Sequence, residues 1–266
     1  MTRLPYRRTL FPFPAALRRI ALGLGLGLAA ALVPATGVFA QDRPGSKHLT
    51  LLGITSATTA PSGTVFGSLS LTNRRGGVGR SADGSAELGF GLGDARKGVG
   101  LQFSAVVTSL SNNLGDSGYL NFKAARQIAG GRTPTFIGLE VDHIGNWGQA
   151  RRSKPGVNLA LTTFGQAQMG AAGDYYPYMV TLGVGSRLRA NRTKPGVFLG
   201  AGLGLSENLA ISAAWTGEAV DIGAGLRLTG LPNTYFSAAV NDAFDTRNSR
   251  RVTVSIGWAL ADVFGR

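Results

Sequence analysis

Apolar and polar residues alternate in short stretches along most of the chain. The clearest stretch is the last one, where Val252, Val254, Ile256, Trp258 and Leu260 alternate with Thr, Ser, Gly and Ala residues. A period of two places the two sets of side chains on opposite faces of a β-strand. Segments rich in Gly, Asn and Asp, which favour turns, separate the stretches. The pattern therefore predicts an all-β chain built of antiparallel hairpins.

Twelve stretches of this kind are expected to form strands. They cover residues 64–71, 85–92, 98–109, 119–126, 136–144, 157–164, 178–188, 196–203, 209–216, 219–228, 235–241 and 251–260. We expect residues 165–177 to form a loop. A membrane-spanning strand takes roughly 9–11 residues, and single-chain bacterial barrels have even strand numbers. We therefore predict an antiparallel up-and-down transmembrane β-barrel of about 12 strands, within a range of roughly 10–14.

Glycine is unusually frequent, with 40 residues in a chain of 266. Three of the predicted strands share a Gly-x-Gly core flanked by Leu or Ile, at residues 88–92, 199–203 and 222–226. No helical pattern follows any of them, which argues against a dinucleotide-binding loop. Glycines that face the interior of a barrel would leave room there for water or for a plug.

Residues 1–40 have the pattern of a secretory signal peptide. Five arginines precede an apolar stretch at residues 20–33, and Val38-Phe39-Ala40 fits a cleavage site before Gln41. The apolar stretch is shorter than the roughly 20 residues of a spanning helix, which favours cleavage over an uncleaved anchor. Residues 41–63 then form a leader, in which residues 48–56 are either a short strand or a lumenal segment. The barrel is expected to occupy residues 64–266.

The formal net charge is +13, and five of the basic residues lie in the predicted signal peptide. Most of the remaining basic residues fall outside the predicted strands, and no nucleic-acid-binding motif is present, so we expect no nucleic-acid partner. The absence of cysteine excludes disulfides and thiol catalysis.

The polar faces of the predicted strands would line the lumen if the apolar faces meet lipid. The lumen-lining candidates are Glu87, Gln102, Asn121, Lys123, Glu140, Asp142, Arg187, Asp221 and Arg227. A charge at the midplane of the lipid costs roughly 2–4 kcal/mol for Arg or Lys, whereas a hydrated or ion-paired lumen removes that cost. Two interpretations follow. The charges select solutes in an open pore, or they form internal salt bridges that hold a narrow barrel closed.

Two long basic loops carry Arg74, Arg75, Arg151 and Arg152. Arginine suits bidentate contacts with phosphate, so these residues are candidates for binding lipopolysaccharide. The alternative is that they are solvated loop residues.

Catalysis and metal binding find little support. The histidines are His48 and His143, and no Gly-x-Ser-x-Gly turn is present. Adjacent strand residues point to opposite faces, so Asp142 is not expected to support His143. Two histidines do not make a zinc site without a further ligand at a suitable spacing. We therefore expect no enzyme, no cofactor and no metal.

The signal segment, the alternating strands and the final strand at residues 252–260 resemble those of bacterial outer-membrane β-barrel proteins. The hairpin at residues 89–94 also resembles one found in exported bacterial proteins. Barrels of this kind commonly end in an aromatic residue that the barrel-assembly machinery reads, whereas here Phe264 is followed by two more residues. The resemblance implies a location in the outer membrane after cleavage near Ala40. It also implies contacts with membrane lipid, lipopolysaccharide and the barrel-assembly machinery.

Three hypotheses for the function remain open. The first is a passive channel or transporter for small solutes. The second is a non-conducting barrel with a structural or surface-interaction role. The third is a soluble exported β-sandwich, which would bury the apolar strand faces against a second sheet. Trp258 and Tyr178, as residues of interfacial aromatic girdles, favour a membrane barrel.

Overall fold

The computed structural model describes residues 47–74, 82–110, 114–169, 173–231 and 233–264. The predicted signal peptide and the first residues of the predicted leader lie outside this part of the chain. Within it the strands are β1 (Val65–Thr72), β2 (Asp83–Gly93), β3 (Gly100–Val107), β4 (Gly118–Ala129), β5 (Thr135–Trp147), β6 (Gly156–Met169), β7 (Asp174–Arg189), β8 (Lys194–Gly204), β9 (Leu209–Trp215), β10 (Val220–Arg227), β11 (Thr234–Asn241) and β12 (Arg251–Leu260). A 3-10 helix, η1 (Gly148–Arg152), follows β5.

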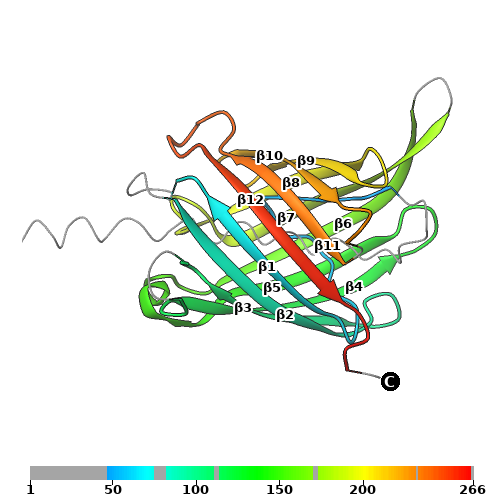
Figure 1. Cartoon of the computed structure of the whole chain (residues 1–266). Helices are drawn as coiled ribbons and strands as arrows, with labels where there is room; N and C mark the ends of the chain where they lie inside the picture. The colour runs from blue at the N-terminus through cyan, green and yellow to red at the C-terminus, as the bar shows by residue number, and fades with distance from the viewer. Residues whose placement is uncertain (1–46, 75–81, 111–113, 170–172, 232, 265–266) are drawn as a thin grey trace, which may run out of the picture.

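The sheet closes into a barrel in which each strand pairs with its neighbours in sequence (Figure 1). The closure is made by β1, whose Leu69 lies opposite Ala86 of β2 on one side and Ile256 of β12 on the other. A closed sheet has no edge strand with unpaired backbone groups. The prediction of a closed antiparallel barrel of twelve strands is confirmed.

The prediction of a loop at residues 165–177 is largely wrong. β6 continues to Met169 and β7 begins at Asp174, so that Gln166 lies opposite Pro177 and Gln168 lies opposite Tyr175. Gly165 makes room for a neighbouring ring, because a Cβ there would lie 2.5 Å from Cζ of Tyr178. The hairpin of β6 and β7 projects beyond the rest of the barrel (Figure 1).

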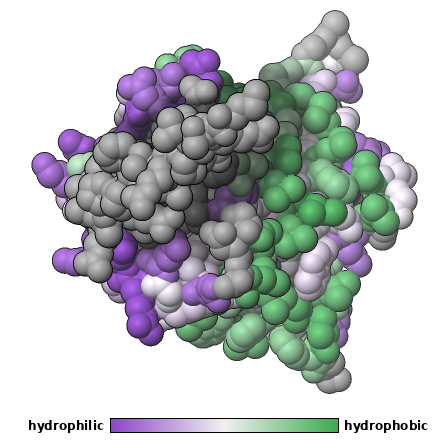
Figure 2. Space-filling view, turned by 60° about the vertical axis from the view of Figure 1, so that its left-hand side comes forward, coloured by the Kyte–Doolittle hydropathy of each residue, from purple (hydrophilic) through white to green (hydrophobic). Residues whose placement is uncertain are grey.

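The outer face of the barrel wall is apolar, whereas the inner face combines polar residues and glycines with some buried apolar residues such as Phe136 and Phe198. In β12, Val254 and Leu260 are 48% and 47% exposed, whereas Thr253 and Ser255 are 3% and 8% exposed. Figure 2 shows hydrophobic side chains gathered over the outer wall. A soluble β-sandwich would bury its apolar strand faces, so this arrangement argues against that hypothesis. No helix in the described part of the chain is long and apolar enough to span a membrane.

Aromatic rings form a row on the outer surface across neighbouring strands. The ring centroids of Phe90 and Phe103 are 5.4 Å apart, and those of Phe103 and Phe122 are 5.0 Å apart. Phe264, beyond the end of β12, meets Phe90 edge to face at 6.2 Å. Trp258 lies on the outer face of β12 with 36% of its surface exposed. Aromatic residues at such positions are typical of the girdles of transmembrane barrels.

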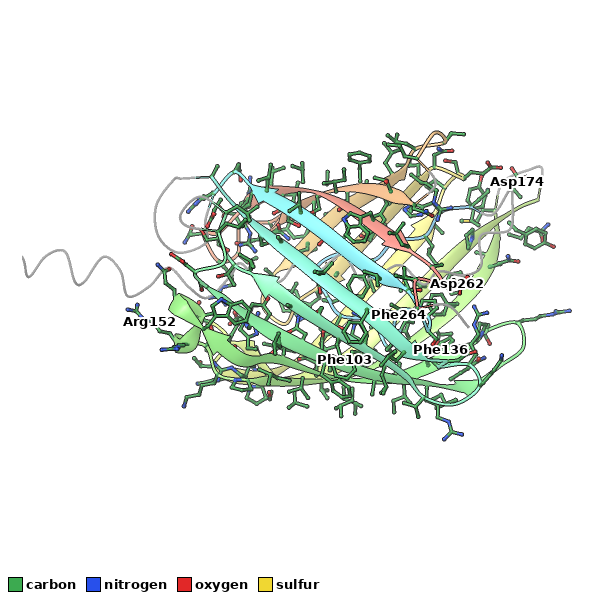
Figure 3. The ribbon with its side chains drawn as sticks, turned by 60° about the horizontal axis from the view of Figure 1, so that its bottom comes forward. Phe103, Phe136, Arg152, Asp174, Asp262 and Phe264 are labelled. Carbon is green, nitrogen blue, oxygen red and sulfur yellow. The ribbon has the colours of Figure 1, made fainter. Side chains whose placement is uncertain are left out.

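The two ends of the barrel differ. The terminal end holds the start of β1, the end of β12 and short connections such as residues 130–134 and 205–208. The loop end holds longer connections, at residues 73–82, 108–117, 148–155 and 242–250, together with two short turns. Figure 3 shows Arg152 at the loop end and Asp174 and Asp262 at the terminal end.

Residues 47–64, which we call the lumenal segment, run inside the barrel without forming a strand (Figure 1, blue). The segment enters at the terminal end, where the His48 amide donates to the carbonyl oxygen of Ser206 at 2.8 Å. It reaches Gly53, which lies against the side chain of Asp221 near the loop end, and then returns to Gly63, whose amide donates to Gly91. Of the two alternatives for residues 48–56, the structure therefore has the lumenal segment.

The lumenal segment fills the interior with an apolar core. Leu51, Ile54 and Ala57 pack against wall residues that include Phe136 and Phe198, and all five are almost fully buried. Its backbone is held by side chains of the wall. The amide of residue 52 donates to Ser212 Oγ at 3.3 Å, that of residue 57 to Thr162 Oγ1 at 2.8 Å, and that of residue 60 to Gln102 Oε1 at 2.9 Å.

The repeated Gly-x-Gly pieces provide the space that this segment occupies. A Cβ at Gly200 would lie 2.6 Å from Cδ1 of Ile54, and a Cβ at Gly223 would lie 2.6 Å from Cδ1 of Leu52. A Cβ at Gly202 would overlap the carbonyl oxygen of Thr50. Larger inward-facing side chains at these positions would therefore exclude the segment from the lumen.

Replacing Gly202 by alanine is expected to loosen the lumenal segment. Because the chain has no cysteine, Ser56→Cys provides a single reporter thiol at a site that is 2% exposed. We expect Gly202→Ala to increase the rate of maleimide labelling of this thiol roughly tenfold, which corresponds to about 1.4 kcal/mol. Gly230→Ala is the matched control, because a Cβ there meets nothing within 4 Å. Equal labelling rates in the two variants would contradict the packing described above.

Candidate functional site

A cavity opens at the loop end of the barrel, above the turn of the lumenal segment. The space inside it that the centre of a water molecule can reach is about 170 Å³. Gly53, Ile54 and Thr55 form its floor, and its walls come from strands β4 to β12 and their connections. The cavity is thus a vestibule at the loop end, separated from the terminal end by the lumenal segment.

One wall of the vestibule is shaped by a bulge in β5. Between Val141 and Ile144, β5 has one more residue than the paired stretch of β4, and His143 has a φ of 56°. As a result, both Asp142 and His143 line the cavity. The expectation that these two side chains point to opposite faces is wrong, because strict alternation fails at a bulge.

Asp142 and His143 form one polar cluster with residues from neighbouring strands. Asp142 accepts a hydrogen bond from Arg192 Nη2 at 2.8 Å and lies 3.3 Å from His143 Nδ1. The His143 ring stacks on the ring of Tyr119, with centroids 3.9 Å apart. Arg192 belongs to the turn between β7 and β8, so this ion pair ties that turn to β5 across β6.

Further ion pairs line the vestibule. Lys123 of β4 lies 3.9 Å from Glu140 of β5, and Arg247 of the β11–β12 connection pairs with Glu218 of the β9–β10 turn. Arg247 also donates to Asn191 Oδ1 at 2.5 Å. These contacts link connections that are far apart in sequence, and they place charges of both signs around the opening.

Asp242 organises the connection between β11 and β12 at the rim of the vestibule. Its carboxylate accepts hydrogen bonds from the amides of Thr246, Arg247 and Ser249 at 2.8, 3.0 and 3.1 Å, and from the hydroxyls of Thr246 and Ser249. Burial alone would raise the pKa of Asp242, but these hydrogen bonds outweigh burial and leave the pKa below its ordinary value. In turn, Asp221 accepts a hydrogen bond from the Asp242 amide.

The structure brings most of the lumen-lining candidates together. Those that line the vestibule are Asn121, Lys123, Glu140, Asp142, Arg187 and Asp221. Gln102 lies deeper and holds residue 60, and Glu87 is 8% exposed with no hydrogen-bond partner for Oε1 among the described residues. Arg227 ends β10 at the terminal end, away from the vestibule.

Several vestibule residues have no counterpart in the sequence prediction. Arg192, Glu218 and Arg247 lie between the predicted strands. Neither they nor Tyr119 were among the lumen-lining candidates. Their convergence depends on the curvature of the barrel, for which the local pattern carries no signal. No group of three His, Asp or Glu side chains in the described part of the chain is arranged to hold a metal ion.

An apolar outer wall, an inner wall that combines polar residues and glycines, and a fully closed hydrogen-bond ladder are now established. The fold is that of an outer-membrane β-barrel. Such a barrel resides in the membrane because its outer wall matches hydrocarbon and all its strands are paired.

Comparison with known proteins gives similarity at the level of structure. A KdgM porin is 12% identical, with a TM-score of 0.47, and the alignment covers 73% of this chain and 98% of that one. The Acinetobacter baumannii outer membrane protein Omp33 is 10% identical, with a TM-score of 0.40 and coverages of 74% and 97%. An outer membrane channel from Pseudomonas putida F1 is 11% identical, with a TM-score of 0.39 and coverages of 77% and 98%. No protein-family model matches the sequence. No curated protein matches it either.

Removing the Asp242 carboxylate is expected to destabilise the rim in a pH-dependent way. The pKa of Asp242 is lowered in the folded state. Its carboxylate therefore contributes to the free energy of unfolding above the ordinary pKa of about 3.9, and this contribution is lost as the pH falls through the pKa of the folded state. Asp242→Asn should therefore lower the free energy of unfolding at pH 7 by about 2 kcal/mol. This loss corresponds to a fall of roughly 4–8 °C in the midpoint of thermal unfolding.

Thermal unfolding of the refolded protein in detergent, followed by circular dichroism, measures this effect. Asp245→Asn is the control, because the Asp245 carboxylate accepts a hydrogen bond from the Arg250 amide at 3.1 Å but does not gather the donors that Asp242 holds. The difference between Asp242→Asn and the unmodified chain should shrink on acidification below the ordinary carboxyl pKa of about 3.9. A difference that is constant with pH would rule out the charged carboxylate as its source.

Proposed function

We propose that the protein is an outer-membrane channel for small solutes whose pore is closed at rest by the lumenal segment. The observation that carries the proposal is the position of residues 47–64, which occupy the lumen from the terminal end to the floor of the vestibule. The wall needs nothing from this segment for closure, because its twelve described strands pair with one another around the full circle. Displacing the segment therefore breaks no strand pairing.

The contacts of the lumenal segment support reversible closure. Its backbone is held by isolated hydrogen bonds to Ser212, Thr162 and Gln102 rather than by a continuous ladder. Isolated hydrogen bonds of this kind contribute roughly 0.5–1.5 kcal/mol each. Most of the attachment is the burial of small and medium apolar side chains against the glycine-lined wall. A polar vestibule above the segment gives hydrated solutes access to it.

We propose that the loop end faces the outside of the cell and the terminal end faces the periplasm. Barrels of this class have short periplasmic turns and longer extracellular loops, and the connections at the two ends follow that difference. Arg74, Arg151 and Arg152 then lie on the outer side, where we propose that they contact lipopolysaccharide phosphates. Arg75, the fourth candidate, lies outside the described residues. Cleavage near Ala40 and delivery by the barrel-assembly machinery complete this proposal.

The lumenal segment offers a direct test by single-channel recording in planar bilayers. We expect the chain of residues 41–266 to insert without conducting, and the chain of residues 61–266 to give discrete conductance steps. A chain of residues 47–266 is the matched control, since it is shortened but keeps the segment. A heat-modifiable gel shift establishes that each protein has folded.

Two outcomes would overturn the proposal in different ways. If residues 41–266 conduct as well as residues 61–266, the lumenal segment does not close the pore. If residues 61–266 insert and remain silent, the barrel is not a channel, and a structural or surface-interaction role takes its place.

A further inference from the structure

Two irregularities in the wall turn extra side chains into the vestibule. In β5, the bulge directs both Asp142 and His143 into the cavity. In β7, the three residues between Gly185 and Arg189 lie opposite the single residue between Lys194 and Gly196, and both Arg187 and Leu188 line the cavity. Regular alternation would send one member of each pair toward lipid. Bulges that redirect side chains in this way are common beside functional sites.

Arg187 differs from the other cations of the vestibule. Lys123, Arg192 and Arg247 each pair with a carboxylate, and Arg251 also has a partner. Among the residues that the structure describes, Arg187 has neither an ion pair nor a hydrogen bond. It is half-buried, so its guanidinium is available on the cavity side.

A second unused donor lies in the same cavity. The Tyr119 side chain is 1% exposed and is fixed by stacking on His143. Its hydroxyl has no hydrogen-bond partner in the described part of the chain, although Tyr119 lines the vestibule. The hydroxyl oxygen is not among the fully buried polar atoms that lack a partner, so it remains accessible. A ligand atom in the cavity would accept a hydrogen bond from it.

We propose that Arg187 and Tyr119 form a binding site for a small anion that carries a carboxylate or phosphate group. A guanidinium presents a planar fork of donors that matches either group, and the phenol adds one donor. Repulsion from nearby acids is limited, because Asp142 is engaged by Arg192 and Glu140 lies beside Lys123. The inference rests on the proposed function in that it names the class of solute for the channel.

The anion would bind while the barrel is closed. The floor of the vestibule at residues 53–55 remains in place, and the cavity opens into solvent at the loop end. Binding can therefore be measured without any conductance, and the failure of one proposal can be distinguished from the failure of the other. A silent chain of residues 61–266 would remove the channel and leave the anion site standing.

Isothermal titration calorimetry of refolded residues 41–266 in a non-ionic detergent tests the site at constant ionic strength. The probes are D-gluconate, inorganic phosphate and sorbitol, which has the gluconate skeleton without the carboxylate. We expect at least one of the two anions to bind and sorbitol not to bind. Whichever anion binds more tightly identifies the preferred group.

The variants separate a specific site from general attraction of anions. Arg187→Gln should weaken binding roughly tenfold or more, and Tyr119→Phe roughly three- to tenfold. Arg189→Gln is the matched control. It removes the same charge two residues along the chain from Arg187, and the Arg189 side chain does not line the cavity. It should therefore change the affinity less than about twofold. Arg187→Lys keeps the charge without the fork and should retain part of the affinity. If Arg187→Gln does not refold, the loss of affinity in Arg187→Lys tests the site instead.

Three results would overturn the inference. One is the absence of binding by either anion at about 10 mM, which corresponds to less than roughly 3 kcal/mol of binding free energy. The second is binding of sorbitol as tight as that of gluconate. The third is an equal loss of affinity in Arg187→Gln and Arg189→Gln.

Discussion

Lipid offers no hydrogen-bond partner to a protein backbone, so every amide and carbonyl group of a membrane-spanning wall must be paired within the wall. In this chain the requirement is met where β1 pairs with β12, which joins the two ends of the barrel sequence. The rest of the structure follows from that closure. Once the wall is a circle, one face of every strand meets hydrocarbon and the other meets an enclosed space. Apolar residues therefore cover the outside, and the polar residues gather inside.

The inside of the barrel poses a second problem, because twelve strands enclose more space than their own side chains fill. The chain meets it with residues 47–64, which bring Leu51, Ile54 and Ala57 into the lumen. The glycines of the repeated Gly-x-Gly pieces are needed for this packing rather than for strand geometry alone. The lower lumen thus has an apolar core of the kind found in soluble proteins, whereas the vestibule above it is polar and charged.

The period-two pattern was enough to predict the strands, their number and the lipid-facing residues. Residues 251–260, for example, were predicted as a strand with the bounds that the structure has. The failures have physical causes. Bulges at His143 and Arg187 change which side chains share a face, and nothing in the local alternation marks them. Residues 47–64 are neither alternating nor helical, because their environment comes from six or more distant strands. The polar network of the vestibule depends on barrel curvature, which brings Arg192 to Asp142 across 50 positions of sequence.

The lumenal segment enters and leaves the barrel at the same end and continues without a break into β1. It is therefore covalently attached to its own barrel, so the release and return of the segment under the proposed function would be intramolecular events. For a short tether the effective concentration is in the millimolar range, so occupancy of the lumen would not change when the protein is diluted or crowded in the membrane. A free peptide of the same sequence would have to exceed that concentration to compete. Control over the lumen would thus belong to whatever acts on the chain immediately before residue 47.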